Sequence, residues 1–250
     1  MSRLPRPRLE PTGAQGLEPS GPARNRILRA LPPQDRSRLI AGLRPAKLQL
    51  GDVIGEPGQR VGYMYFPTSA VVSSLYTTED GQTAEMGLVG NDGVVGLSLF
   101  LGGDATSNQA TVVVAGDALR LDASVLRKEF SAGGPLQSLL LRYTQSFITQ
   151  ISHIAVCNRL HAVEQRLCRW LLMCRDRVDG DDLEMTQEFI ANVLGGRRET
   201  VTVAAGRLQD AGLIRYSRGH IAIVDRKGLE AAACECYPVV AAWTDRSVAV

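Results

Sequence analysis

The segment from Met185 to Asp225 holds the residues whose types and spacing suit recognition chemistry best. Arg198 and Glu199 stand side by side near the start of a predicted helix. An arginine at such a place can donate two hydrogen bonds to guanine O6 and N7, and a glutamate can accept one from cytosine N4. We therefore predict that Arg198 and Glu199 read base edges of double-stranded DNA.

Hydroxyl and cationic side chains around this pair suit contacts to phosphate groups, which position a protein on DNA without reading its sequence. From Arg197 to Lys227, seven basic residues stand against three acidic ones, which gives a local charge of +4. A helical hairpin with a merely solvated charged face is the alternative interpretation. The predicted phosphate contacts are Thr186, Arg197, Thr200, Thr202, Arg207 and Arg218.

Two short helices and a hairpin must position these side chains. Thr186 is a suitable N-cap for a helix that carries Phe189, Ile190, Val193 and Leu194, and Gly195-Gly196 can form the turn that ends it. Val201, Ala204, Ala205 and Leu208 then follow i, i+3, i+4, i+7 spacing, which indicates a second helix with a narrow buried face. The runs 213–216 and 220–224 predict a β-hairpin wing. The pattern is that of a winged helix-turn-helix, whose second helix enters the major groove.

Upstream of this segment the chain changes character twice. Residues 25–43 predict short helices interrupted by Pro32-Pro33, and residues 46–130 contain short β-rich runs separated by Gly, Asp and Asn. The runs are KLQL, DVI, YMYF, AVVSSLY, TAEMGLV, GVVG, QATVVVA and ALRL. Strands at this spacing predict an antiparallel β-roll, and Asp80-Gly81 marks a hairpin between two of them.

A long helix is predicted after Gly133-Gly134-Pro135, with two apolar stripes along it. One stripe would cover the β-roll and the other could meet the same helix of a second subunit. We expect a homodimer; an internal helix of a monomer is the alternative. The predicted dimerisation residues are Leu136, Leu140, Tyr143, Phe147, Ile151 and Ile154, and the second stripe is Leu141, Ile148 and Ala155. Another helix is predicted over 161–177.

The composition fits a folded protein of two domains. Hydrophobic residues make up 44% and charged residues 22% of 250, the formal charge is +2, and neither a signal peptide nor a membrane span is evident. We expect an α+β protein in the cytoplasm that contacts no membrane. Residues 1–24 form a predicted disordered tail, with a DNA-contacting basic arm as the alternative. The other predicted parts are a β-roll at 25–132, a dimerisation helix at 133–160 and a DNA-binding domain at 161–250.

The five cysteines are Cys157, Cys168, Cys174, Cys234 and Cys236. An odd number in a reducing compartment indicates free thiols, and one Cys-x-Cys pair is a weaker metal signal than repeated Cys-x-x-Cys. We expect packing roles, no metal and no cofactor, while a redox switch at Cys234 and Cys236 stays open. His153 and His161 are interpreted as ordinary helix residues. G-x-S-x-G, a phosphate-binding loop and His-Glu-x-x-His are all missing, so no enzyme is predicted.

The run from Phe189 to Ile214, with Arg198-Glu199-Thr200-Val201 and Ala211-Gly212-Leu213-Ile214, resembles the DNA-binding domain of the Crp/Fnr superfamily of bacterial transcription regulators. Leu50-Gly51-Asp52-Val53-Ile54, Gly58 and Tyr65-Phe66 resemble the cyclic-nucleotide-binding-type β-roll of that family. The resemblance covers about residues 26–230. It implies a homodimer on a two-fold symmetric operator, with RNA polymerase as a further partner. It also implies a third base-reading position, which is Val203 here.

The chain departs from this family at the place of the effector. Members that bind cyclic AMP have a ribose-binding glutamate and a phosphate-binding arginine, but the corresponding runs here are Val95–Phe100 and Ser107–Ala110. Cyclic AMP is therefore not expected, and the small-molecule effector is left open. The predicted effector-pocket residues are Gly96, Leu97, Ser98, Asn108 and Gln109. The alternative function is a ligand-sensing or protein-interaction β-roll whose helix-turn-helix does not bind DNA.

Overall fold

The structure is a computed structural model, and it describes residues 21–195, 198–217 and 219–248. The helices are α1 (Arg26–Ala30), α2 (Pro33–Ile40), α3 (Ala123–Ser131), α4 (Pro135–Leu160), α5 (Val163–Arg175), α6 (Gln187–Leu194), α7 (Arg198–Asp210), α8 (Arg226–Ala232) and α9 (Cys236–Val248). The strands are β1 (Arg44–Leu48), β2 (Val53–Gly55), β3 (Tyr63–Pro67), β4 (Val71–Thr77), β5 (Thr83–Val89), β6 (Gln109–Val114), β7 (Gly116–Asp122), β8 (Asp182–Glu184), β9 (Ile214–Ser217) and β10 (His220–Ile223).

The predicted β-roll is confirmed as two antiparallel sheets in the described chain, with strand orders β1-β7-β3 and β2-β6-β4-β5. The hairpin between β4 and β5 forms at the predicted place, where Gly81 has φ +84° and Thr77 pairs with Thr83. The predicted strand GVVG is wrong, because Val95 makes only an isolated bridge with Tyr65. This stretch leads into a short 3₁₀ helix over Leu97–Leu99.

The N-terminal helices are held against the β-roll by a buried asparagine. The Oδ1 atom of Asn25 accepts hydrogen bonds from the amides of Ile27 and Leu28, which caps α1. Its Nδ2 atom donates to the carbonyls of Pro67 and Gly93. Pro22–Arg24, which the sequence placed in the disordered tail, form a 3₁₀ helix, so order begins before residue 25. Residues 1–20 of the predicted tail lie outside the described residues.

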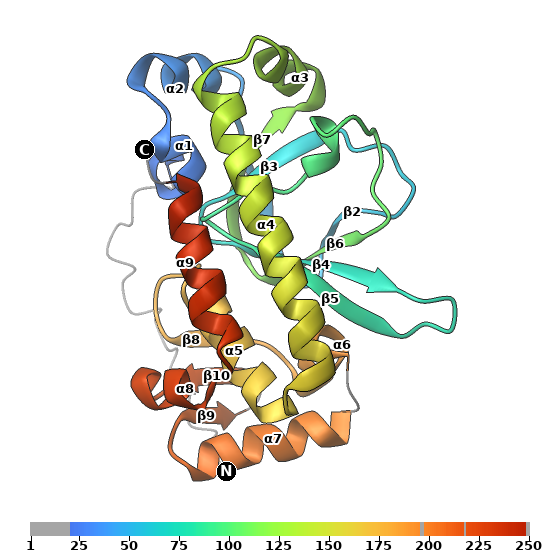
Figure 1. Ribbon diagram of the computed structural model, residues 1–250, viewed down its shortest axis with the longest axis vertical. Coiled ribbons are helices and arrows are strands. Elements are labelled where there is room, and N and C mark those ends of the chain that lie inside the picture. The colour runs from blue at the N-terminus through green and yellow to red at the C-terminus, as the bar shows by residue number, and fades with distance from the viewer. Residues whose placement is uncertain (1–20, 196–197, 218, 249–250) are drawn as a thin grey trace, which may run out of the picture.

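The predicted long helix is confirmed as α4, which runs along one side of the β-roll (Figure 1). Gln150 on α4 bonds to both backbone groups of Leu88, so that the helix satisfies part of the edge of β5. Within the described residues, α4 and the other helices lack the combined length and apolar composition that a membrane span needs.

The C-terminal part packs closely on the β-roll. Apolar residues of α5, including Leu167, Trp170 and Leu171, share one hydrophobic core with Leu75 and Leu88 of the four-stranded sheet. After the hairpin of β9 and β10, α8 and α9 bring the chain back, and α9 lies alongside α4 and runs in the opposite direction (Figure 1). No local sequence pattern predicts this return of the C-terminal helix onto α4.

Candidate functional site

The predicted helix-turn-helix is formed by α6 and α7. Thr186 caps α6, because its Oγ1 atom accepts a hydrogen bond from the amide of Phe189 at 3.2 Å. Gly195 ends α6 in the left-handed conformation, with φ +63°. Gly196 and Arg197, one of the predicted phosphate contacts, lie outside the described residues. Three residues thus separate the two helices, and the first of them is the glycine that ends α6, as the sequence predicts.

Helix α7 has one buried face and one exposed face. Val201, Ala204, Ala205 and Leu208 are each at most 5% exposed, as their spacing predicts. At 3.6 residues per turn the opposite side is centred on Glu199, Val203 and Gly206. Figure 1 shows α7 at the far end of the molecule from α2 and α3. The exposed residues of this helix as far as Arg207 are called here the α7 exposed face, and they are Arg198, Glu199, Thr200, Thr202, Val203, Gly206 and Arg207.

Several predicted phosphate contacts already have intramolecular partners. Arg207 forms an ion pair with Glu164 of α5, which ties α7 to the preceding helix. The hydroxyl of Thr202 donates to the carbonyl of Arg198 at 2.9 Å. Both side chains remain exposed to solvent. A phosphate contact by Arg207 would therefore have to share or replace its bond to Glu164.

The wing is present as a three-stranded sheet of described strands in the order β8-β10-β9. Ser217 pairs with His220 across the hairpin, and the amide of Tyr216 donates to Gln209 of α7 at 2.8 Å. This bond fixes the wing relative to α7. Arg218, the predicted phosphate contact at the wing tip, lies outside the described residues.

A cavity of about 300 Å³ lies between the β-roll and α4 at the place of the predicted effector site. Gly96, Leu97, Ser98 and Asn108 line it, whereas Gln109 does not. Its other lining residues are mainly aliphatic and aromatic, and α4 contributes Thr144, Phe147, Ile148 and Ile151. Among the lining residues that the structure describes, none carries a formal charge. The cavity, called here the β-roll pocket, suits an uncharged and largely apolar molecule better than an anion.

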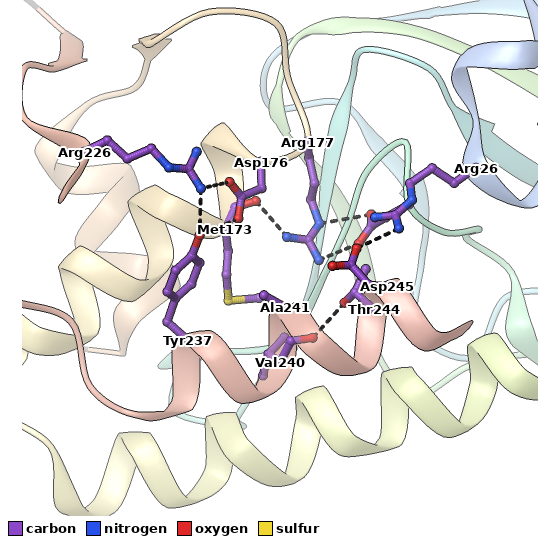
Figure 2. A pocket seen from close by; sticks show the side chains of 11 residues that line it. Arg26, Met173, Asp176, Arg177, Arg226, Tyr237, Val240, Ala241, Thr244 and Asp245 are labelled. Carbon is purple, nitrogen blue, oxygen red and sulfur yellow. Dashed lines mark hydrogen bonds and ion pairs between the residues drawn. The ribbon is translucent and has the colours of Figure 1, made fainter. Parts of the chain in front are cut away.

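A second cavity, of about 320 Å³, lies where the end of α5 meets α9 and the N-terminal helix (Figure 2). Arg177 makes a bidentate ion pair with Asp92 of the β-roll, with nitrogen–oxygen distances of 2.6 and 3.0 Å. Its Nη1 atom also donates to the carbonyl of Met173. Arg26 pairs with Asp245, and Arg226 pairs with Asp176. Since the charged lining residues that the structure describes are all paired, we interpret this cavity as a junction between elements.

A buried glutamate joins the β-roll to α5 a short way from this junction. Glu85 on β5 is 3% exposed, and its Oε2 atom accepts hydrogen bonds from Trp170 Nε1 at 2.8 Å and from Ser73 Oγ at 2.9 Å. Burial raises the pKa of Glu85, although Arg169 acts in the opposite direction. The sequence analysis did not single out Glu85 or Asp92. A charged residue within a strand or glycine-rich loop carries no signal of its burial.

Four of the six predicted dimerisation residues lie on the wrong face of α4. Leu136, Leu140, Tyr143 and Ile154 are at most 6% exposed within one chain, so they have no surface left for a partner. Leu136, Leu140 and Tyr143 belong to the core of the β-roll, and Phe147 and Ile151 line the β-roll pocket. The second stripe is the free one: Leu141 is 48% and Ile148 is 51% exposed, and Ala155 is exposed as well. We call Leu141, Ile148 and Ala155 the α4 exposed stripe.

Three of the five cysteines lie close to a histidine at the C-terminal end of α4. The ligand atoms of Cys157, His161, Cys234 and Cys236, called here the Cys–His cluster, all lie within 4.8 Å of one another. The hydrogen bond with Cys234 lowers the pKa of the Cys157 thiol, because it stabilises the thiolate. In contrast, burial raises the pKa of Cys168, which packs in the main core, to about 12. The expected packing role thus fits Cys168 and Cys174, whereas the other three thiols group with a nitrogen ligand.

Comparisons with known proteins agree with this architecture. Residues 45–132 match the family model of the cyclic nucleotide-binding domain, and residues 165–232 match that of the Crp-like helix-turn-helix domain. A CRP-like cAMP-activated global transcriptional regulator of Mycobacterium tuberculosis is 27% identical over 218 residues, which covers 83% of this chain and 96% of the relative.

Solved structures show the same fold. FixK2 from Bradyrhizobium japonicum has a TM-score of 0.63 at 17% identity, covering 77% of this chain and 98% of its own. The c-di-GMP responsive global regulator CLP of Xanthomonas campestris has a TM-score of 0.60 at 18% identity, covering 77% and 99%. The two domain models, their order along the chain and the α+β architecture place this chain in the Crp/Fnr superfamily of transcription regulators.

Proposed function

We propose that this regulator binds a two-fold symmetric DNA operator as a homodimer, with α7 of each chain in a major groove. The observation that carries the proposal is the α7 exposed face. Arg198, Glu199 and Val203 are exposed on the helix that follows Gly195, while its apolar residues Val201, Ala204, Ala205 and Leu208 are buried. Hydrogen-bonding groups and an apolar group on one accessible helix face are what base reading needs. RNA polymerase as a further partner stays a prediction.

The α4 exposed stripe is the surface through which the dimer would form. Leu141, Ile148 and Ala155 are spaced seven residues apart, which is the repeat of a coiled-coil seam. Between Tyr143 and Asn158 the helix has no Asp, Glu, Lys or Arg, so two copies can approach without burying a like charge. Thr144 and Ile151, which lie between the stripe positions, are half-buried and complete the seam.

The β-roll pocket would hold an uncharged effector instead of a cyclic nucleotide. A cyclic nucleotide brings a phosphate anion, and burying a polar group without a partner costs about 1–3 kcal/mol, with more for a charge. The pocket offers hydroxyl and amide groups from Ser74, Ser98, Thr106 and Asn108 but no described cation. The M. tuberculosis relative is named as cAMP-activated and the X. campestris neighbour as c-di-GMP responsive, so the effector differs among similar proteins.

Selection of bound duplexes from random DNA tests the first proposal. We expect a palindromic motif whose affinity falls steeply with salt, because Lys and Arg contacts release counterions from phosphates. Arg198→Ala should lower discrimination at one guanine by about 1–3 kcal/mol. Arg60→Ala removes the same charge from an exposed site on the β-roll and should leave the motif unchanged. Failure to select any motif would favour a protein-interaction module, and an unchanged motif with Arg198→Ala would refute the base-reading role.

Sedimentation tests the dimer. Ile148→Glu puts a charge into the α4 exposed stripe and should shift the protein to monomers, because two like charges would face each other in an apolar seam. Gln59→Glu adds the same charge at an exposed position of the β-roll, between β2 and β3, and should leave the dimer intact. A dimer that survives Ile148→Glu would show that another surface associates.

Equilibrium dialysis with cyclic AMP tests the pocket. We expect no saturable binding to the full chain, and the M. tuberculosis relative provides a positive control. Saturable binding of cyclic AMP that is lost in Ser98→Trp, which would fill the pocket, would refute the proposal. Absence of saturable cyclic AMP binding in both the wild-type chain and Ser98→Trp supports it.

A further inference from the structure

We propose that the Cys–His cluster is a binding site for one zinc ion, held by three thiolates and one imidazole. The site joins two segments that are far apart in the sequence. Cys157 lies in the last turn of α4 and His161 is the residue that follows this helix. Cys234 lies between α8 and α9, and Cys236 is the first residue of α9. The proposal is independent of whether the protein binds DNA.

The distances suit a single tetrahedral ion. With Zn–S bonds of about 2.3 Å and Zn–N bonds of about 2.0–2.1 Å, tetrahedral angles place two sulfur ligands about 3.8 Å apart and a sulfur and a nitrogen about 3.6 Å apart. The sulfur atoms of Cys157 and Cys234 are 3.5 Å apart, and Cys236 Sγ is 3.8 Å from His161 Nδ1. Thiolates that bind different irons of a polynuclear iron–sulfur cluster must span the cluster. The mutual approach of these ligand atoms within 4.8 Å therefore favours a mononuclear site.

The histidine is oriented as a metal ligand. His161 Nδ1 faces Cys236, while its Nε2 atom lies 3.2 Å from the carboxylate of Glu235. Metal-binding histidines commonly donate their second ring N–H to a carboxylate, which fixes the tautomer and makes the other nitrogen a better ligand. Glu235 is 77% exposed and lies between the two cysteines of the Cys-x-Cys pair. The same short segment thus supplies two ligands and the group that orients a third.

The surroundings of the cluster carry positive charge that a thiolate site would balance. Arg166 and Arg169 of α5 are 8% and 1% exposed, and the Nε atom of each has no hydrogen-bond partner among the described residues. Buried charges are usually paired. Three thiolates and one Zn²⁺ ion have a net charge of −1. Such a site next to α5 would offset part of this buried positive charge.

Four protein ligands leave no open position, which is the composition of a structural zinc site. The three sulfur atoms are almost fully buried and form a cluster of their own, apart from the hydrophobic cores. A bound ion would fasten the start of α9 to the end of α4. This is also the place where the chain passes from α4 to α5 through His161 and Ala162.

Elemental analysis of the untagged full chain, purified under reducing conditions without chelators, tests the site. We expect one zinc per chain, retained in Cys168→Ala and His153→Gln, which change a cysteine and a histidine outside the cluster. Cys236→Ser and His161→Gln should lose it. Zinc content near zero in the wild-type protein, a stoichiometric iron content, or a Cys157–Cys234 disulfide in the protein as isolated would overturn the proposal.

Two further measurements do not depend on whether a ligand variant folds. Co²⁺ added to the zinc-depleted wild-type protein should give the visible bands of a tetrahedral thiolate site, and their absence would count against the geometry. Glu235→Ala leaves all four ligands in place, and loss of such an outer carboxylate lowers metal affinity about 10–100-fold. In competition with a chromophoric chelator we expect that loss for Glu235→Ala and no change for Glu184→Ala, an exposed control. Equal zinc affinities of Glu235→Ala and Glu184→Ala would refute the role of Glu235 in orienting His161. Equal affinities together with the absence of visible cobalt bands would refute the zinc site itself.

Discussion

Replacing Asp92 with asparagine removes the negative partner of a buried arginine at the junction of the β-roll with α5. The side chains of Asp92 and Arg177 are 7% and 4% exposed and make two short hydrogen bonds to each other. Asp92 Oδ1 also accepts from the amide of Gly90. In Asp92→Asn one of the two charge-assisted bonds to Arg177 is lost, and the guanidinium keeps its charge in a site with little access to water.

Breaking one partner of a buried ion pair costs about 3–5 kcal/mol, because the remaining charge is uncompensated. We therefore expect Asp92→Asn to lower the free energy of unfolding by an amount in this range. Urea denaturation followed by tryptophan fluorescence measures it, since Trp170 lies in the core shared by α5 and the β-roll. The double variant Asp92→Leu/Arg177→Met should recover most of the loss, because a buried pair replaced by apolar groups is often neutral or stabilising.

Asp104→Asn is the matched control. Asp104 pairs with Arg127 on the surface, where its side chain is 60% exposed, and exposed pairs contribute about 0–1 kcal/mol. If Asp92→Asn and Asp104→Asn lower stability equally, the burial argument is wrong. If the double variant is no more stable than Asp92→Asn, the cost arises from packing and not from the unpaired charge.

Two further predictions concern Gly93 and Glu85 of the β-roll. A Cβ atom at Gly93 would lie 2.3 Å from the Tyr143 ring, so Gly93→Ala should lower the free energy of unfolding, measured by urea denaturation, by about 1–3 kcal/mol. The control Gly206→Ala adds a Cβ atom in open space on α7 and should raise the free energy of unfolding by about 0.5–1 kcal/mol. Equal changes in the two variants would contradict the predicted clash with Tyr143. Burial raises the pKa of Glu85 above its ordinary 4.5, so the folded state holds a proton that the unfolded state has lost, and stability should fall as the pH rises from about 4.5. Glu85→Gln should remove this part of the pH dependence in urea midpoints, and identical slopes would refute it.

The helix-turn-helix was predictable because both of its signals are local. Apolar residues at Val201, Ala204, Ala205 and Leu208 follow the helical period, and a glycine marks the end of the preceding helix. Local signals also gave most strands of the β-roll. The stretch Gly93–Gly96 was misassigned, because β-branched residues favour strands only where a neighbouring strand is available, and here only one bridge forms.

The spacing of apolar residues predicts two apolar stripes on α4. It does not predict which stripe packs on the β-roll and which faces a partner chain or solvent. The stripe that includes Leu140 and Tyr143 is richer in large side chains, and the sequence analysis assigned it to a partner chain. In the structure these large side chains fill the core of the β-roll, and the smaller second stripe faces solvent. The choice between them depends on the sheet that packs against the helix, which is a non-local property.

The sequence favours packing roles for the cysteines over a metal site, and the grouping of three of them with His161 could not be predicted for the same reason. Cys157 and His161 are four residues apart at the end of a helix, which places them on one face, and Cys234 and Cys236 form a second pair. Each pair alone is a weak signal. The two pairs come together because α9 returns along α4, and no local sequence pattern predicts that return.

The orientation of α7 relative to α4 depends on a very short connection. A dimer must present its two reading helices about 34–36 Å apart, one turn of DNA, to bind adjacent major grooves. Between α4 and α5 only His161 and Ala162 are extended, so small rotations there would move α7 a long way. Three contacts oppose such rotations: the Arg177–Asp92 pair just beyond the end of α5, the Glu85–Trp170 bond between β5 and α5, and the Cys–His cluster between the end of α4 and the start of α9. Because the β-roll pocket is lined by α4 and by Val94–Ser98, close to Asp92 in the chain, a ligand bound there would act on the same restraints that would set the spacing of the two α7 helices in the proposed dimer.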